Sequence, residues 1–223
     1  MRKLVVGTFL TLDGVMQAPG GQEEDRSGGF THGGWVVPHF DDMMAQAMVE
    51  WVRRLDGLVL GRRTYEIFAR YWPRVIAPDP IAEQLNRVPK YVASRTLKQG
   101  DWNPTTVLGG DVPLAVRQLK EKSGTGELQV HGSGELLQTL LKHGLIDEFR
   151  IWIFPVVLGS GKKLFAGGTV PAALALTESR NSTTGVALHV YRPAGTPTYG
   201  SAELGEPVGE EFAERWRKDA NVR

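Results

Sequence analysis

Two short segments have the residue types and the placement expected of phosphate-binding turns. Gly61-Arg62-Arg63-Thr64 follows the apolar residues 58–60, and Gly132-Ser133-Gly134-Glu135 follows the apolar residues 128–130. Glycines let backbone amides approach a ligand closely, and the N-terminus of a helix after the turn attracts an anion. The threonine hydroxyl and the two arginines add charge-assisted hydrogen bonds. Because a dinucleotide carries phosphates at two places, the two turns together predict dinucleotide binding.

Each of these signals also has a purely structural interpretation. The first segment could be an N-capped helix whose arginines are solvated. The second is shorter than the full G-x-G-x-x-G pattern, and it lacks the G-x-S-x-G spacing of a nucleophile elbow. A third turn, Ser94-Arg95, could bind a ribose phosphate or be an ordinary polar turn. Gly159 and Gly161 could line a ligand or make a tight corner.

The composition excludes several other classes of function. The 223 residues include 26 basic and 25 acidic side chains, so the chain lacks the basic surplus of a nucleic-acid or acidic-membrane binder. There is no cysteine, which excludes disulfides and thiolate chemistry, and the five histidines have no metal-ligand spacing. No apolar run approaches the ~20 residues that span a membrane. We therefore expect a cytoplasmic protein without metal, nucleic-acid or membrane partners.

Strand and helix signals alternate along most of the chain and predict an α/β fold. The expected strands are residues 3–10, 58–60, 91–94, 105–108, 128–130, 147–158, 174–177 and 187–192, and the expected helices are residues 40–55, 62–68, 81–86, 112–122 and 135–143. Alternating elements of this kind imply a mostly parallel sheet with helices on both faces. The last two strands have no helix between them, which implies an antiparallel edge.

Glycine and proline mark the expected boundaries. One domain is expected over residues 1–195, followed by a C-terminal tail, residues 196–223, with a short helix at residues 210–218. Asp56-Gly57 is expected to break the chain between the first helix and the next strand. Residues 15–34 hold three glycine pairs among polar residues and are interpreted as a long loop. Because such a loop can bury little apolar surface, we expect a mobile lid.

These segments, taken with Thr11-Leu12-Asp13-Gly14, resemble the dihydrofolate-reductase-like superfamily. The closest likeness is to the reductase domain of the bifunctional riboflavin-biosynthesis deaminase–reductase. Residues 61–66 match the Gly-Arg-x-Thr-x-Glu segment of that family, and Gly132-Ser133-Gly134 matches its glycine-rich turn. Residues 155–161 together with Leu164-Phe165 match the riboflavin branch. The likeness covers roughly residues 3–192 and is specific as a set of motifs.

The resemblance implies a reductase that binds NADPH. The adenosine-side phosphates would be held by Arg62, Arg63 and Thr64, the 2′-phosphate by Ser94 and Arg95, and the pyrophosphate by the second turn. The full set of implied cofactor-binding residues is Thr8, Gly61, Arg62, Arg63, Thr64, Ser94, Arg95, Gly132, Ser133, Gly134, Glu135 and Leu136. The arginines supply charge for an extra phosphate, which predicts NADPH rather than NADH.

The substrate side is implied by the same resemblance. Folate reductases bind the pterin through a carboxylate on the first helix, and Asp41 and Asp42 lie near that position. Asp13 follows the first strand and could face the nicotinamide or the substrate. These three acids are the candidate catalytic residues, although each could be an ordinary first-turn or turn acid. The candidate substrate-binding residues are Met16, Trp35, Leu158, Gly159 and Gly161.

Three functions stay open. The first is an NADPH-dependent reductase that transfers a hydride to a pteridine- or pyrimidine-like heterocycle. The second is a riboflavin-biosynthesis reductase acting on 5-amino-6-(5-phosphoribosylamino)uracil, whose phosphate would need a basic clamp such as Lys162-Lys163. The third is a dinucleotide-binding protein without catalysis, since fold resemblance alone does not fix function. We also expect a homodimer formed through the sheet edge or late strands, because residues 147–158 form a long apolar stretch that needs cover.

Overall fold

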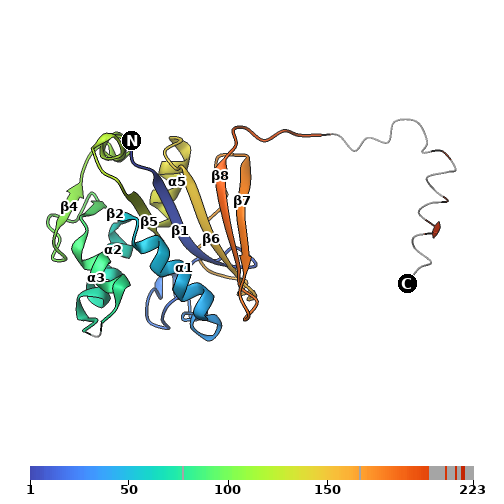
Figure 1. Cartoon of the computed structure of the whole chain (residues 1–223), viewed down its shortest axis with the longest axis horizontal. Coiled ribbons are helices and arrows are strands. Elements are labelled where there is room, and N and C mark those ends of the chain that lie inside the picture. The colour runs from blue at the N-terminus through green and yellow to red at the C-terminus, as the bar shows by residue number, and fades with distance from the viewer. Residues whose placement is uncertain (77, 166, 201–208, 210–213, 215–216, 219–223) are drawn as a thin grey trace.

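Eight strands of the described chain form one sheet in the order β4-β3-β2-β5-β1-β6-β8-β7 (Figure 1). Their bounds are β1 Leu4–Thr11, β2 Leu55–Gly61, β3 Lys90–Ala93, β4 Thr105–Leu108, β5 Glu127–His131, β6 Glu148–Phe154, β7 Leu174–Asn181 and β8 Ala187–Pro193. The strands from β4 to β6 pair in parallel, whereas β8 pairs antiparallel with β6 and with β7. The predicted α/β sheet with an antiparallel edge is confirmed.

This computed structural model describes residues 1–200 except 77 and 166, together with residues 209, 214, 217 and 218. The helix expected at residues 210–218 therefore lies largely outside the described residues. The α-helices are α1 Asp42–Val52, α2 Arg62–Tyr71, α3 Pro80–Arg87, α4 Val112–Glu121 and α5 Gly134–Lys142. Short 3-10 helices occupy Ser27–Gly29, Val37–His39 and Trp72–Arg74. All five α-helices stand where the sequence predicts a helix, with ends that differ by up to three residues.

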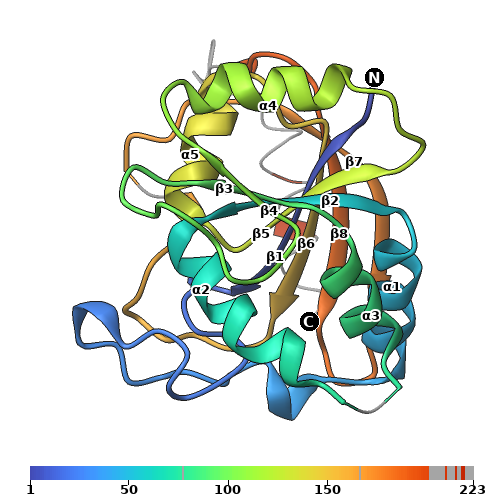
Figure 2. The ribbon, with the colours of Figure 1, turned by 90° about the vertical axis from the view of Figure 1, so that its left-hand side faces the viewer.

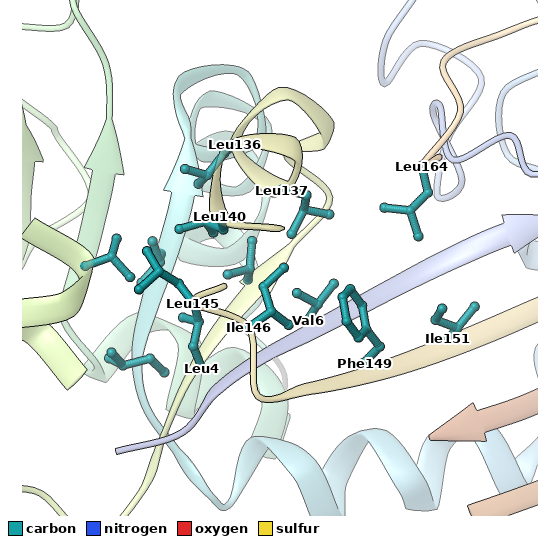
Figure 3. Close-up of a cluster of buried hydrophobic side chains, with 14 of the residues drawn as sticks. Leu4, Val6, Leu136, Leu137, Leu140, Leu145, Ile146, Phe149, Ile151 and Leu164 are labelled. Carbon is teal, nitrogen blue, oxygen red and sulfur yellow. The ribbon is translucent and has the colours of Figure 1, made fainter. Parts of the chain in front are cut away.

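Alternation along the strands divides the apolar core between the two faces of the sheet. One face packs against α4 and α5, where Phe149 and Ile151 of β6 meet the leucines of α5 (Figure 3). The other face packs against α1, α2 and α3, and there Trp152 and Phe154 of β6 meet Trp51 of α1 (Figure 2). Because successive side chains of a strand point to opposite faces, β6 contributes to both cores and is covered on both sides.

The structure corrects the expected break at Asp56-Gly57. Both residues lie inside β2, next to a register shift in its pairing with β5. The Asp56 carboxylate accepts a hydrogen bond of 2.7 Å from Arg2. A Cβ added at Gly57 would lie 3.1 Å from side chains of Leu128 and Tyr91, so the missing side chain lets these neighbours pack closely. The glycine thus serves packing within the strand rather than a turn.

The expectation that residues 15–34 bury little apolar surface is wrong. Val15, Ala18 and Phe30 form a small core of their own and are each at most 5% exposed. Gln17 ties the segment together, since its Nε2 donates to the carbonyls of Asp25 and Ser27. The segment therefore has the buried side chains and internal hydrogen bonds that the lid interpretation left out.

Candidate functional site

The helices that follow neighbouring strands lie on opposite faces of the sheet at β5. The strands that flank β5 are β2 and β1, which lead into α2 and α1 on one face, whereas β5 leads into α5 on the other face. In open α/β sheets, ligands bind beyond the carboxyl ends of the strands at such a switch point. The topology therefore places a ligand at the end of β5, which is the position of Gly132-Ser133-Gly134.

The two predicted phosphate turns lie against each other at this point. The amide of Gly61 donates to Ser133 Oγ over 2.9 Å, and the amide of Ser133 donates to Thr64 Oγ1 over 3.1 Å. Ser133 Oγ in turn donates to the carbonyl of His131. Ser133 adopts the left-handed conformation with φ of 58°, and Gly132 before it has φ of 54°. Hydrogen bonds between residues about 70 positions apart thus join the turns into one surface.

The N-termini of α2 and α5 differ from those of the other α-helices described. Asp41, Asp79 and Asp111 cap α1, α3 and α4 by accepting first-turn amides through their carboxylates. By contrast, α2 begins after Gly61 and α5 after Ser133, and neither has a side-chain cap. First-turn amides without an intrahelical acceptor favour an anion. The alternative interpretation of residues 61–64 as an N-capped helix is therefore wrong, and both turns present free donors.

The arginines of the first turn have different surroundings. Arg62 is exposed and forms an ion pair of 2.9 Å with Glu66 one helical turn away. Arg63 is also exposed, and its only described polar contact is a long hydrogen bond of 3.4 Å to Ser27 Oγ. Arg63 thus keeps its charge free of a carboxylate in the described structure, whereas Arg62 does not.

The remaining candidate cofactor residues divide into surface and core positions. Ser94 Oγ accepts the amides of residues 96 and 97, as in an ordinary polar turn, and Arg95 beside it is exposed. Glu135 is exposed in the first turn of α5, but the side chain of Leu136 is 8% exposed and belongs to the core. Thr8 is buried in β1 with only a 3.5 Å contact to the next carbonyl. Leu136 could therefore contribute to a ligand only through its backbone.

Asp13 joins the end of β1 to the segment after β6. Its carboxylate accepts hydrogen bonds from Thr11 Oγ1 at 2.6 Å and from the amides of Leu158 and Gly159 at 3.2 and 2.9 Å. The Thr11 bond is the main cause that lowers the pKa of Asp13 to about 2. A carboxylate that is ionised near neutral pH and bonded on both oxygens has no proton to deliver. These contacts give Asp13 a structural role, and the catalytic role expected from the sequence stays a prediction.

The other two candidate acids lie at the N-terminus of α1. Asp41 accepts the Met44 amide and also the amide and hydroxyl of Thr183, so it ties α1 to the β7–β8 hairpin. The bond from Met44 is the main cause that lowers the pKa of Asp41. Asp42 is exposed in the first turn of α1 and has no described side-chain hydrogen bond. Asp41 is therefore a helix cap, and its contact with a heterocycle stays a prediction.

Replacing Asp13 with Asn should lower stability at neutral pH and matter less in acid. The pKa of Asp13 is depressed in the folded chain, so its stabilising contribution is present above about pH 4 and is lost as the pH falls towards 2. Urea unfolding midpoints of wild type and Asp13→Asn, measured from pH 7 down to pH 2, should therefore converge in acid. Asp101→Asn, at an exposed residue, is the control and should show no such gap. A gap that is independent of pH would contradict this role.

The candidate substrate residues lie close to the switch point but pack largely among themselves. Trp35 is 6% exposed, donates from Nε1 to the Gln17 carbonyl and packs edge-on against Phe154. A Cβ added at Gly161 would lie 2.7 Å from Val15, so this glycine makes the tight corner that the sequence left as an alternative. Leu158 and Gly159 are the residues that bind Asp13.

Met16 is the exception among these residues. It is 9% exposed, and its sulfur would lie 3.3 Å from a Cβ added at Gly134 in the second turn. The loop of residues 15–34 therefore reaches the N-terminus of α5, where the second turn ends.

Lys162, half of the proposed substrate-phosphate clamp, is already engaged. Its Nζ lies 2.6 Å from the Asp25 carboxylate and 2.6 Å from Ser27 Oγ. The hydrogen bonds from Lys162 and Ser27 lower the pKa of Asp25 against the opposing effect of its burial. Lys163 is exposed, and no carboxylate partner is described for it.

His131 is a polar residue of this region that the sequence analysis did not name as a candidate. It ends β5 and lies in register with Gly7 of β1. Its Nε2 lies 3.2 Å from Gln129 Oε1, and burial together with the nearby Arg150 lowers its pKa to about 4. Its position directly before a predicted ligand turn was the available signal.

The fold is an open α/β sheet with two uncapped helix N-termini at its switch point, which is where open α/β sheets commonly bind anionic ligands. The chain belongs to the RibD C-terminal domain family, whose model matches residues 2–188. The resemblance to the dihydrofolate-reductase-like superfamily is thereby confirmed, and the chain is a protein of the riboflavin-biosynthesis reductase type. No helix among the residues that the structure describes is long and apolar enough to cross a membrane.

Three similar proteins show how widely this fold and sequence recur. The chain is 28% identical over 193 residues to the uncharacterized protein YyaP of Bacillus subtilis, which covers 85% of this chain and 94% of YyaP. A candidate riboflavin biosynthesis protein from Shewanella sp. PV-4 has the same fold, with a TM-score of 0.61, 23% identity and coverage of 86% and 98%.

The third comparison is with a two-activity protein. It is the diaminohydroxyphosphoribosylaminopyrimidine deaminase/5-amino-6-(5-phosphoribosylamino)uracil reductase of Thermotoga maritima. This neighbour has a TM-score of 0.57 and 13% identity, and the match covers 86% of this chain but 57% of that one. At this identity the likeness shows the fold alone.

Proposed function

We propose that the protein is an NADPH-dependent reductase that transfers a hydride to a flat nitrogen heterocycle of the pyrimidine or pteridine kind. The single observation that carries the proposal is the pair of uncapped helix N-termini, α2 and α5, joined by Ser133 at the switch point. Two adjacent anion sites match the two phosphate positions of a dinucleotide. Membership of the RibD C-terminal domain family supports a reductase.

The residues present fit such a cofactor. The first-turn amides of α2 and α5 have no side-chain acceptor, the glycine at position 132 lets Thr64 of the first turn pack closely against the second, and Arg63 supplies a charge with no described carboxylate partner. The cofactor, when bound, supplies the hydride. The contribution of this chain is to bind the phosphates through α2 and α5 and to orient the ring in the crevice beside β5 and β1. The proton that balances the reduction comes from water in this proposal, since Asp13 and Asp41 are engaged elsewhere and Asp42 is an exposed residue that equilibrates with water.

A substrate without a phosphate group is favoured over the phosphorylated pyrimidine of riboflavin biosynthesis. The supporting observation is the ion pair of Lys162 with Asp25, which neutralises half of the only clamp that the sequence offers. A phosphate ester would have to displace that carboxylate, and like charges held close together repel. The riboflavin-pathway reaction stays the second candidate because of the family match.

A substrate screen tests the proposal. NADPH and NADH are titrated first, and NADPH oxidation is then followed with dihydrofolate, with 5-amino-6-(5-phosphoribosylamino)uracil and with its dephosphorylated riboside. We expect NADPH binding and NADPH oxidation with dihydrofolate, whose ring takes the hydride. The two ribosylaminopyrimidines take the hydride at the ribosyl carbon, and of these the unphosphorylated one should have the higher kcat/KM. A preference of about tenfold or more for the ester, or about 1.4 kcal/mol, would establish the riboflavin-pathway alternative instead. Binding without any turnover would support a non-catalytic dinucleotide-binding protein, and no binding would refute the proposal.

We also propose a homodimer through the β7 edge. The part of the apolar stretch that forms β6 is paired with β1 and β8 within the chain, so it does not itself require a partner. The edge strand β7 instead leaves one side of its backbone unpaired in the described structure, and Leu176 on it is 53% exposed. Such edges commonly pair with a second chain. Sedimentation at micromolar concentration should give twice the 24.5 kDa of one chain, and a mass of one chain would contradict this.

A further inference from the structure

His131 stands at the point where the topology directs a ligand. It is the last residue of β5, directly before the turn at Ser133. That turn leads into α5 and is hydrogen-bonded to the N-terminus of α2. Its ring faces the side of the sheet that carries α1 and α2, since it lies 6.2 Å from the ring of Phe68 in α2. Beside it in register on β1 is Gly7, where an added Cβ would lie 3.3 Å from His131 Cε1 and 3.4 Å from Nδ1. The imidazole therefore overhangs a strand position that has no side chain.

The hydrogen bonds around His131 fix which nitrogen carries its proton. The amide nitrogen of Gln129 donates to the carbonyl of Trp51 over 2.9 Å and to the carboxylate of Glu127 over 3.3 Å. The amide oxygen of Gln129 is thereby turned towards His131, and Nε2 must donate to it across 3.2 Å. Nδ1 is left with a lone pair and no described partner. Because burial and the charge of Arg150 keep the pKa of His131 near 4, the ring is neutral at pH 7.

We propose that His131 is a substrate-contacting residue whose Nδ1 accepts a ring N–H of the heterocycle. The inference rests on the proposed function. The phosphate turns occupy the ends of β2 and β5, so the rest of a dinucleotide and its substrate continue along the crevice towards β1, where His131 and Gly7 lie. Of the three acids expected to play this part, Asp13 and Asp41 are engaged elsewhere, and Asp42 is an exposed first-turn residue of α1. An accepting nitrogen requires a donor, so the substrate class is a heterocycle with an amide-like ring N–H. A site built to bind such a donor rejects an analogue that lacks it.

Two matched variants separate this role from a packing role. The amide of Asn can place an oxygen near the position of Nδ1, whereas the amide of Gln reaches the position of Nε2 and its bond to Gln129. On the best substrate of the screen, His131→Asn should keep kcat/KM within roughly threefold of wild type, whereas His131→Gln and His131→Phe should lose roughly 10- to 100-fold. NADPH affinity should stay within about twofold in all three variants. Rescue by Gln and not by Asn, or full activity in all variants, would overturn the proposal.

A measurement without turnover tests the same contact. With nitrogen-15-labelled histidine, the wild type saturated with NADP⁺ should show His131 as the Nε2–H form at pH 7. Addition of 5-aminouracil, a pyrimidine with ring N–H groups, should move the Nδ1 resonance upfield as it accepts a hydrogen bond. The signal is assigned by its loss in His131→Asn. Binding of NADP⁺ with no response to 5-aminouracil would overturn the role of His131 alone, whereas failure to bind NADP⁺ would refute the proposed function.

Discussion

Replacing Arg150 with Met should destabilise the protein by about 3–5 kcal/mol, the usual cost of breaking a buried ion pair. The Arg150 side chain is 3% exposed and donates to Glu148 over 2.9 Å and to Glu127 over 2.8 Å. Its guanidinium also lies 5.0 Å from the ring of Trp51. Removing the cation leaves two buried carboxylates with weaker partners, and methionine restores only the lost packing. Urea unfolding at pH 7 measures the difference.

Arg192→Met is the matched control for this prediction. Arg192 also approaches Glu148, but at 3.4 Å and with 55% of its side chain exposed. Exposed ion pairs contribute about 0–1 kcal/mol, so the control should stay close to wild type. Equal losses for the two variants would show that burial does not set the strength of this cluster. Arg150→Met/Glu127→Gln should recover part of the loss, because one of the two uncompensated charges is then removed.

Periodicity and turn residues predicted most elements of the fold because these signals are local. The short apolar runs in β2 and β6 and the helical spacing in α1 need no knowledge of distant partners. The edge strand β7 was predicted short, since its residues 178–181, Glu-Ser-Arg-Asn, carry no apolar signal. They form a strand because they pair with the apolar β8. Tertiary pairing, rather than propensity, set the length of this strand.

The site was predicted in part for the same reason. The two turns carry local signals, and the order of the strands brings them together. The partners of Asp13 and Asp41 could not be predicted because the groups that bind them are remote: Gly159 lies 146 positions from Asp13, and Thr183 lies 142 from Asp41. A sequence shows that an acid follows a strand, but not which amides its carboxylate will meet. His131 was passed over because its accepting nitrogen is defined only by the hydrogen bonds of Gln129.

Arg63→Ala should weaken NADPH binding by about 1.5–3 kcal/mol, the contribution of a hydrogen bond to a charged group, and should weaken NADH binding less. The sequence alone assigns Arg62 the same effect. The structure separates the two residues, because the ion pair of Arg62 with Glu66 must be broken before Arg62 can bind a phosphate. Arg62→Ala should therefore cost less than Arg63→Ala.

Glu66→Gln completes the comparison of the two arginines. It frees the guanidinium of Arg62, which is exposed and adjacent to the turn, so it should strengthen NADPH binding slightly and leave NADH binding nearly unchanged. Fluorescence titration of both cofactors against the four proteins measures all of these effects. If Arg63→Ala weakens the binding of NADH as much as the binding of NADPH, Arg63 does not bind the 2′-phosphate. The discrimination between the cofactors must then lie with another cation at the carboxyl edge of the sheet, and Arg95 after β3 is the next to test.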